Sequence, residues 1–142
     1  MTLRSASAAD LPALVEVEEL CFGPDAWSRN QLTDEFAASR TVIVADDEEG
    51  IAGYATVSLV GPDAELLRIA VLPARRRRGT ARRLLTEAWS RAAERGAERM
   101  LLEVDADNEP AIGLYRRFGF SDLATRRGYY RGRDALVMER RG

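Results

Sequence analysis

The feature that most constrains the fold of this chain is the order in which strand-like and helix-like segments alternate. Short β-branched or apolar runs, typical of strands, are separated by segments whose apolar residues recur at helical spacing. Strands are expected at residues 3–6, 41–45, 51–59, 65–72, 100–104, 123–127 and 134–139. Hairpins at both ends and crossover helices in the middle predict an α/β (α+β) fold, with one mixed sheet of about seven strands and about four helices covering both faces.

Local signals mark where the four helices begin. Ser7 with Asp10, and Ser28 with Gln31, have the spacing of capping boxes. Asn108 is a good N-cap in front of a glutamate and a proline. The predicted helices span residues 7–20, 28–38, 80–96 and 108–119.

Length, charge and cysteine content describe an ordinary globular protein. The 142 residues are enough for one domain, expected to span residues 1–142. A net charge of −2 argues against a chain that binds polyanions over its whole surface. Cys21 is the single cysteine, which excludes an internal disulfide and fits the cytoplasm. No apolar run approaches about 18 residues, and residues 1–10 lack the apolar core of a signal peptide, so we expect no membrane association.

The absence of histidine restricts the chemistry further. It removes Ser-His-Asp and Cys-His catalysis and argues against a zinc enzyme, so no metal is expected. Any general base must be an Asp, Glu or Tyr side chain or an N-terminal amine.

The segment from Leu67 to Leu85 is the strongest candidate for a ligand site. A strand runs into an arginine-rich turn, and a helix starts just after Gly79. Small residues at Gly79 and Ala81 let a ligand approach the backbone. The free N–H groups and the dipole at a helix start favour a diphosphate, and Arg77, Arg78 and Arg82 would add positive charge. The alternative is that residues 75–78 form a solvated face or bind nucleic acid, although no aromatic residues for base stacking lie nearby.

The same segment resembles a known motif. Residues 76–81 are similar to the acetyl-CoA pyrophosphate motif of the GCN5-related N-acetyltransferases, with Arg76 in place of the frequent glutamine and Ala81 in place of glycine. The runs IAVLP, LLEVDADNEPAIGLYRRFGF and RRGYY…DALVM extend the resemblance over essentially the whole chain. They resemble the branch of this family that acetylates N-terminal alanine of ribosomal proteins. The link at residues 131–133 is shorter than in many members.

The resemblance implies a fold whose central strands splay apart to hold acetyl-CoA, and direct transfer to an amine without an acyl-enzyme. It implies that Glu103 is the base and that Tyr115 protonates the leaving thiolate. From pattern alone, Glu103 could equally be a surface-facing strand residue and Tyr115 a core tyrosine. The implied cofactor contacts are Ile69, Ala70, Val71, Arg77, Arg78, Gly79, Thr80, Ala81, Arg82, Asn108 and Tyr115, with the N–H of Val71 on the acetyl oxygen. The implied substrate contacts are Trp27, Tyr129 and Tyr130.

The expected acceptor is the N-terminus of a protein or peptide, foremost a ribosomal protein. An α-amine has a pKa of about 7.7–8.0, against about 10.4 for lysine, so a carboxylate base suits it better. Three alternatives stay open: acetylation of a small amine or a protein lysine, a non-catalytic module that binds RNA or the ribosome, and an acyl-CoA sensor without catalysis. We expect a monomer or a weak dimer that does not bind nucleic acid directly.

Overall fold

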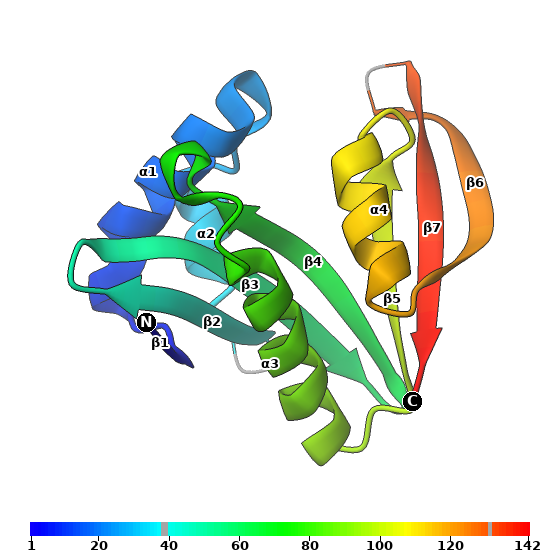
Figure 1. Ribbon diagram of the computed structural model, residues 1–142, viewed down its shortest axis with the longest axis horizontal. Helices are drawn as coiled ribbons and strands as arrows, with labels where there is room; N and C mark the ends of the chain where they lie inside the picture. Colours follow the sequence, from blue (N-terminus) through cyan, green and yellow to red (C-terminus); the bar gives the residue numbers. More distant parts are fainter. Residues whose placement is uncertain (38–39, 131) are drawn as a thin grey trace.

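The computed structural model describes residues 1–37, 40–130 and 132–142, apart from the side chain of Tyr130 (Figure 1). Along these residues, seven strands and four α-helices follow one another in the predicted order. They are β1 (Thr2–Ser5), α1 (Leu11–Phe22), α2 (Arg29–Asp34), β2 (Arg40–Asp47), β3 (Gly50–Val60), β4 (Asp63–Val71), α3 (Thr80–Glu94), β5 (Arg99–Asp105), α4 (Glu109–Arg117), β6 (Ser121–Tyr130) and β7 (Arg133–Arg141). Short 3-10 turns precede α1, α2 and α3: η1 (Ala8–Asp10), η2 (Gly23–Asp25) and η3 (Pro73–Arg75).

The strands form one mixed sheet in the order β1-β2-β3-β4-β5-β7-β6. Neighbouring strands are antiparallel except β4 and β5, which run parallel and are connected through α3. Helices α1 and α2 pack on one face of the sheet, and α3 and α4 pack on the other (Figure 1). The predicted mixed sheet covered on both faces is therefore confirmed.

The helix α3 illustrates how the sequence pattern becomes a packed element. Leu84, Leu85, Ala88 and Ala92 lie on one side of the helix and are buried against the sheet. Each fully buried leucine contributes roughly 1.5–3 kcal/mol of burial free energy. This packing fixes the start of α3 relative to β4.

The two central strands separate halfway along their length. Pairing between β4 and β5 joins Asp63–Leu66 to Arg99–Leu102 and stops there. In the β3–β4 ladder, Thr56 lies opposite Arg68 whereas Val57 lies opposite Leu66, which leaves Leu67 as an extra, bulged residue. A bulge bends its strand and increases its twist. Beyond it, β4 and β5 diverge as the two arms of a V, as expected (Figure 1).

Some element boundaries differ from the expected ones. The capping box of α2 is present, since Ser28 Oγ accepts from the N–H of Gln31 at 3.1 Å and the Gln31 side chain accepts from the N–H of Ser28 at 2.7 Å. However, α2 ends at Asp34, and the predicted end at Ala38 lies outside the described residues. The strand expected at residues 41–45 is longer, because pairing with β3 keeps both Asp46 and Asp47 in β2. No helix in the described part of the chain has the length and apolar character needed to span a membrane.

Candidate active site

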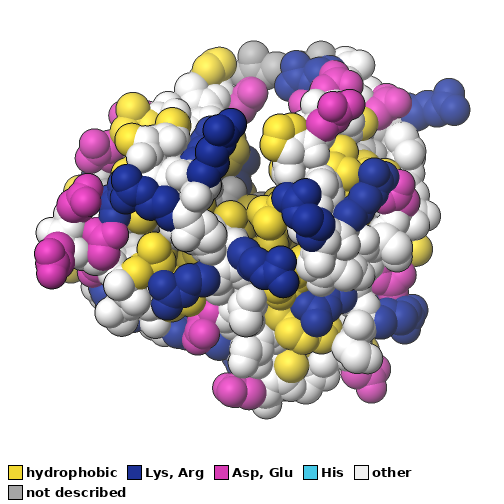
Figure 2. All heavy atoms as spheres, viewed as in Figure 1, with side chains coloured by type: hydrophobic (Ala, Val, Ile, Leu, Met, Phe, Trp, Pro, Cys, Tyr) yellow, Lys and Arg dark blue, Asp and Glu magenta, His cyan; other side chains and the backbone are white. Residues whose placement is uncertain are grey.

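A cavity of about 940 Å³ lies where β4 and β5 separate. Its walls come from the end of α1, the second half of β4, the start of α3, the second half of β5, and α4. In Figure 2, basic side chains surround the hollow between the two arms, and hydrophobic side chains lie deeper. The cavity is therefore apolar inside and positively charged at its rim.

The start of α3 presents main-chain donors to this cavity. Gly79 is the N-cap, with a φ of 77° and no side-chain capping bond, and its carbonyl accepts the first helical hydrogen bond from the N–H of Arg83 at 3.1 Å. The N–H groups of the following three residues have no acceptor within the helix. Thr80, Ala81 and Arg82 line the cavity. This arrangement suits the oxygens of a diphosphate.

The side chain of Thr80 shows that this cradle fits an oxygen-rich ligand. Thr80 is 2% exposed, and among the described residues its Oγ1 atom is buried without a hydrogen-bond partner. A buried hydroxyl without a partner costs free energy, and a ligand oxygen would remove that cost. Arg76, Arg77, Arg82 and Arg117 also line the cavity and supply positive charge.

The main chain of β4 turns donors and acceptors toward the open side. The N–H of Leu72 donates to the carbonyl of Ala52 at 2.8 Å, and Val71 lies opposite Gly53. In an antiparallel ladder, residues adjacent to such a bonded pair direct their N–H and C=O groups away from the partner strand. The main-chain groups of Val71, and by the same alternation those of Ile69, therefore point from β3 toward the gap.

Glu103 and Tyr115 come to the same cavity from different elements. Along β5, Leu102 and Val104 are buried on the side of α3 and α4, so Glu103 lies on the opposite face. Its carboxylate is 24% exposed and accepts from Arg126 Nη1 at 2.6 Å. Arg126 reaches this carboxylate from β6, the edge strand next to β7. Tyr115 is buried on α4, with its ring edge-on to Phe120 at 5.9 Å between centroids.

Most of the predicted site residues lie together. Those lining the cavity are Trp27, Ile69, Ala70, Val71, Arg77, Gly79, Thr80, Ala81, Arg82, Glu103, Asn108 and Tyr115. Asn108 also caps α4, since its Oδ1 accepts from the N–H of Ala111 at 3.3 Å.

Two of the predicted contacts, Arg78 and Tyr129, do not fall in the lining. Arg78 is exposed at the loop preceding α3, and Tyr129 lies against Arg126, with the guanidinium carbon 4.0 Å from the ring centre. The side chain of Tyr130 is outside the described residues.

The arginine run from Arg75 to Arg78 is not one solvated face. Arg75 is buried and forms an ion pair with Asp47, and Arg76 Nε donates to the carbonyl of Val71 at 3.0 Å. These two arginines therefore bind the loop to the protein. The alternative interpretation of the run as one solvated face is wrong for Arg75, whereas Arg76, Arg77 and Arg78 are exposed.

Sequence reasoning missed several cavity residues. Arg68, Asp25, Asp105, Arg117 and Arg133 line the cavity with the predicted ones. Only Arg68 had a usable signal, as a charged residue between the apolar residues Leu67 and Ile69. The others are brought in by tertiary structure.

The family model for the acetyltransferase (GNAT) family matches residues 11–120. The chain therefore belongs to this family and is an acetyl-CoA-dependent N-acetyltransferase. It is 36% identical to the N-alpha-acetyltransferase RimI of Mycobacterium tuberculosis, over 99% of this chain and 92% of that protein. It is 32% identical to the ribosomal protein bS18-alanine N-acetyltransferase of Escherichia coli K12, over 96% of this chain and 95% of that protein. The crystal structure of the Escherichia coli ribosomal-protein-S18-alanine N-acetyltransferase superposes with a TM-score of 0.93 at 30% identity, covering 99% of this chain and 92% of that one.

Proposed function

We propose that this protein is an N-α-acetyltransferase that moves the acetyl group of acetyl-CoA to the N-terminal amine of a protein, foremost the N-terminal alanine of a ribosomal protein. One observation carries the proposal: a single cavity runs from the main-chain donors of α3 to Glu103 and Tyr115 at the separation of β4 and β5. The names of the two relatives aligned above support the choice of acceptor.

The first half of the cavity would bind the coenzyme. The N–H groups at the start of α3 and the Thr80 hydroxyl donate to the diphosphate, and Arg77 and Arg82 balance its charge. The exposed main chain of β4 at Ile69 and Val71 pairs with the pantetheine chain, as an added strand would. Acetyl-CoA supplies the activated acetyl group as a thioester.

The second half of the cavity would perform the transfer. Glu103 takes up the proton that the amine loses as it bonds to the acetyl carbon, and Tyr115 gives its proton to the departing thiolate. An N-terminal α-amine needs only a weak base, because its pKa is about 7.7–8.0. No protein nucleophile is needed, so the reaction passes through no acyl-enzyme.

The test is a panel of acceptors. Purified protein with acetyl-CoA would be offered peptides beginning with alanine and other residues, the same peptides with a blocked N-terminus and an internal lysine, and free polyamines. We expect mass spectrometry to find one added acetyl group on the N-terminus of the alanine-starting peptides. Turnover confined to polyamines or lysine would reject the N-terminal assignment while leaving the acetyltransferase activity in place.

A further inference from the structure

A buried carboxylate beneath the cavity already has a full set of partners. Glu18 on α1 is 0% exposed, and its oxygens accept from the hydroxyl of Tyr54, from the N–H of Trp27 at 2.8 Å, and from Arg68 Nε and Nη2 at 3.0 and 2.7 Å. A carboxylate has about four lone-pair sites. Glu18 therefore has no capacity left for a substrate proton and serves as an anchor for Arg68.

The guanidinium of Arg68 is held in one orientation. Its carbon lies 3.6 Å from the ring centre of Phe22 and 4.8 Å from that of Trp27. Its Nη2 also donates to the carbonyl of Asp25 at 3.1 Å. Two aromatic rings and a bidentate carboxylate leave little freedom to a planar group of this kind.

One end of this guanidinium remains available. Among the described residues, none accepts a hydrogen bond from Arg68 Nη1, although Arg68 lines the cavity together with Phe22 and Trp27. The side chain is 18% exposed. A fixed, charge-assisted donor thus borders the cavity without a partner in the part of the chain that the structure describes.

Arg68 also lies on the acceptor side of the sheet. Residues 68 and 70 share a face of β4, and Ala70 packs with α1 and α2. Glu103 lies on the same face of the sheet, because Leu102 and Val104 pack on the opposite one. Arg68 and Glu103 therefore border the same half of the cavity from the two separated strands.

We propose that Arg68 is a specificity-determining residue that donates a hydrogen bond to the first peptide carbonyl of the acceptor, and that Glu18 is its positioning residue. This inference rests on the proposed function and names what distinguishes its substrates. The ion pair with Glu18 balances the charge of Arg68, so the site does not repel a cationic N-terminus. A peptide N-terminus carries a carbonyl oxygen next to its α-carbon, whereas a simple amine does not. A site built to bond that oxygen rejects amines that lack it.

The test compares an alanine-starting peptide with the same peptide carrying a thiocarbonyl, a poorer hydrogen-bond acceptor, in the first position. We expect the parent enzyme to prefer the normal peptide by roughly tenfold in kcat/KM, in line with a hydrogen bond to a charged group. Arg68→Met should raise KM for the normal peptide and bring the ratio of the two peptides close to one. Calorimetry should find the affinity for acetyl-CoA unchanged.

A double variant separates specificity from folding. Arg68→Met alone leaves Glu18 buried without its ion pair and is expected to melt at a lower temperature, whereas Glu18→Gln/Arg68→Met removes both charges. If Glu18 acts through Arg68, the double variant should recover thermal stability and still treat the two peptides alike. Tyr54→Phe removes one donor to Glu18 and leaves Arg68 in place, so this variant should still prefer the normal peptide over the thiocarbonyl peptide, as the parent does.

Two results would overturn the inference in different ways. If the variants lose kcat/KM equally for both peptides, so that the ratio stays that of the parent, Arg68 has only a structural role and the proposed function stands. A parent enzyme that acetylates no peptide N-terminus would reject the proposed function and this inference together.

Discussion

At the scale of single residues, the proposed reaction depends on how Glu103 is placed. It lies on β5 where pairing with β4 has ended, so on that side its side chain borders the cavity, while β7 remains paired with β5 on the other side. The partner Arg126 comes from 23 positions further along the chain. The proposed base and its arginine partner are therefore brought together only by the tertiary fold.

We predict that Glu103→Gln lowers kcat by roughly 10²- to 10⁴-fold, the usual contribution of a general base. Acetyl-CoA affinity should stay within about twofold, because the α3 cradle is untouched. Glu139→Gln is the matched control, since Glu139 is also a partly buried strand carboxylate paired with an arginine, Arg99, at 3.3 Å, but lies outside the cavity. Steady-state kinetics and calorimetry check both. If Glu103→Gln keeps the kcat of the parent between pH 6 and 9, Glu103 is not the base of the reaction.

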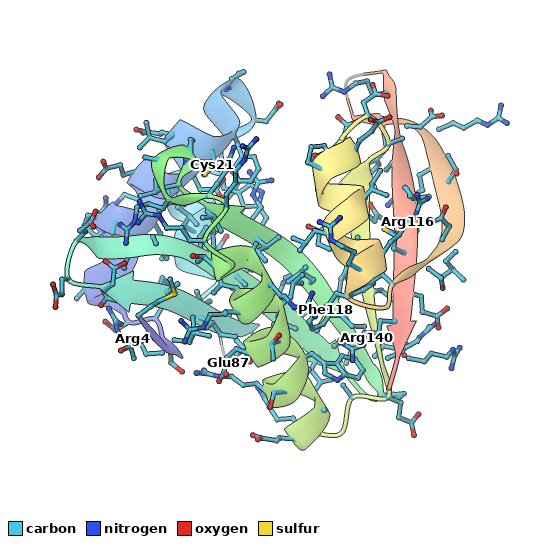
Figure 3. The ribbon with its side chains drawn as sticks, in the orientation of Figure 1. Arg4, Cys21, Glu87, Arg116, Phe118 and Arg140 are labelled. Atoms are coloured by element: carbon cyan, nitrogen blue, oxygen red, sulfur yellow. The ribbon has the colours of Figure 1, made fainter. Side chains whose placement is uncertain are left out.

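Cys21 offers a direct probe of where the coenzyme lies. Its thiol borders the cavity near η3 (Figure 3) and donates to the carbonyl of Val71 at 3.3 Å. Burial raises the pKa of this thiol, so at a given pH less of the reactive thiolate is present than for an exposed cysteine.

We therefore predict slow alkylation of Cys21 by iodoacetamide at pH 7 that accelerates above pH 9. Coenzyme A should slow it further by covering the β4 main chain. The measurement is mass spectrometry of alkylated protein over time, with free glutathione as the control thiol. If Cys21 is alkylated as fast as glutathione, and coenzyme A does not change that rate, the coenzyme binds elsewhere.

At the scale of elements, the helix α3 has different tasks at its two ends. Gly79 at its start and Gly96 beyond its end both have positive φ, 77° and 100°, and an added Cβ would meet nothing within 4 Å at either. The same substitution therefore costs comparable backbone strain, about 1–2 kcal/mol, at the two sites. Only Gly79 lies in the cavity wall.

We predict that Gly79→Asp weakens coenzyme A binding by roughly tenfold or more, because a carboxylate would face the phosphates across the helix start. Gly96→Asp should lower the melting temperature about as much as Gly79→Asp does, and it should leave the affinity for coenzyme A unchanged. Titration calorimetry and thermal unfolding give the two readouts. Equal losses of affinity in the two variants would mean that helix stability, and not a phosphate site, explains the effect.

Elements with local signals were predictable, and their assembly was less so. The Ser28 box, the Asn108 cap and the apolar stripe of α3 depend on residues close in sequence, and all three are present. The bulge at Leu67 depends on how β3 pairs with β4, which no local pattern specifies. The splay itself was expected from family resemblance, not from periodicity.

The same distinction holds for the site. The residues of the cradle at Gly79 are contiguous in the sequence, so the sequence alone predicted them, and they line the cavity. The Glu18–Arg68 pair joins residues 50 positions apart, and the Glu103–Arg126 pair joins residues 23 apart. Arg75 looked like its neighbours in the arginine run, and only its burial beside Asp47 sets it apart.

At the scale of the whole molecule, the two arms are joined at the end opposite the cavity. Arg99 bonds Asp63 of β4 at 2.7 Å and Glu139 of β7 at 3.3 Å. Arg140 lies between the rings of Trp89 on α3 and Phe118 after α4, at 4.6 and 4.4 Å from their centres (Figure 3). Because Arg140 is opposite Met100 in the sheet, and Met100 is opposite Ala64, this contact belongs to the paired end of β4 and β5.

We predict that Arg140→Met lowers the free energy of unfolding by about 1–2 kcal/mol, the loss expected for two partly shielded cation–π contacts. Urea denaturation measures this change. The value of kcat/KM for peptide should stay within about twofold of the parent, because the substitution removes no contact at the separated ends of β4 and β5. In the proposed function, acetyl-CoA binds between the two arms of the folded chain, so at one fixed concentration, 100 times the Kd of the parent, it should add about 2.7 kcal/mol to parent and variant alike. A smaller gain in the variant would mean that the closed end of the sheet governs the width of the cavity, and that the two ends of the molecule are coupled.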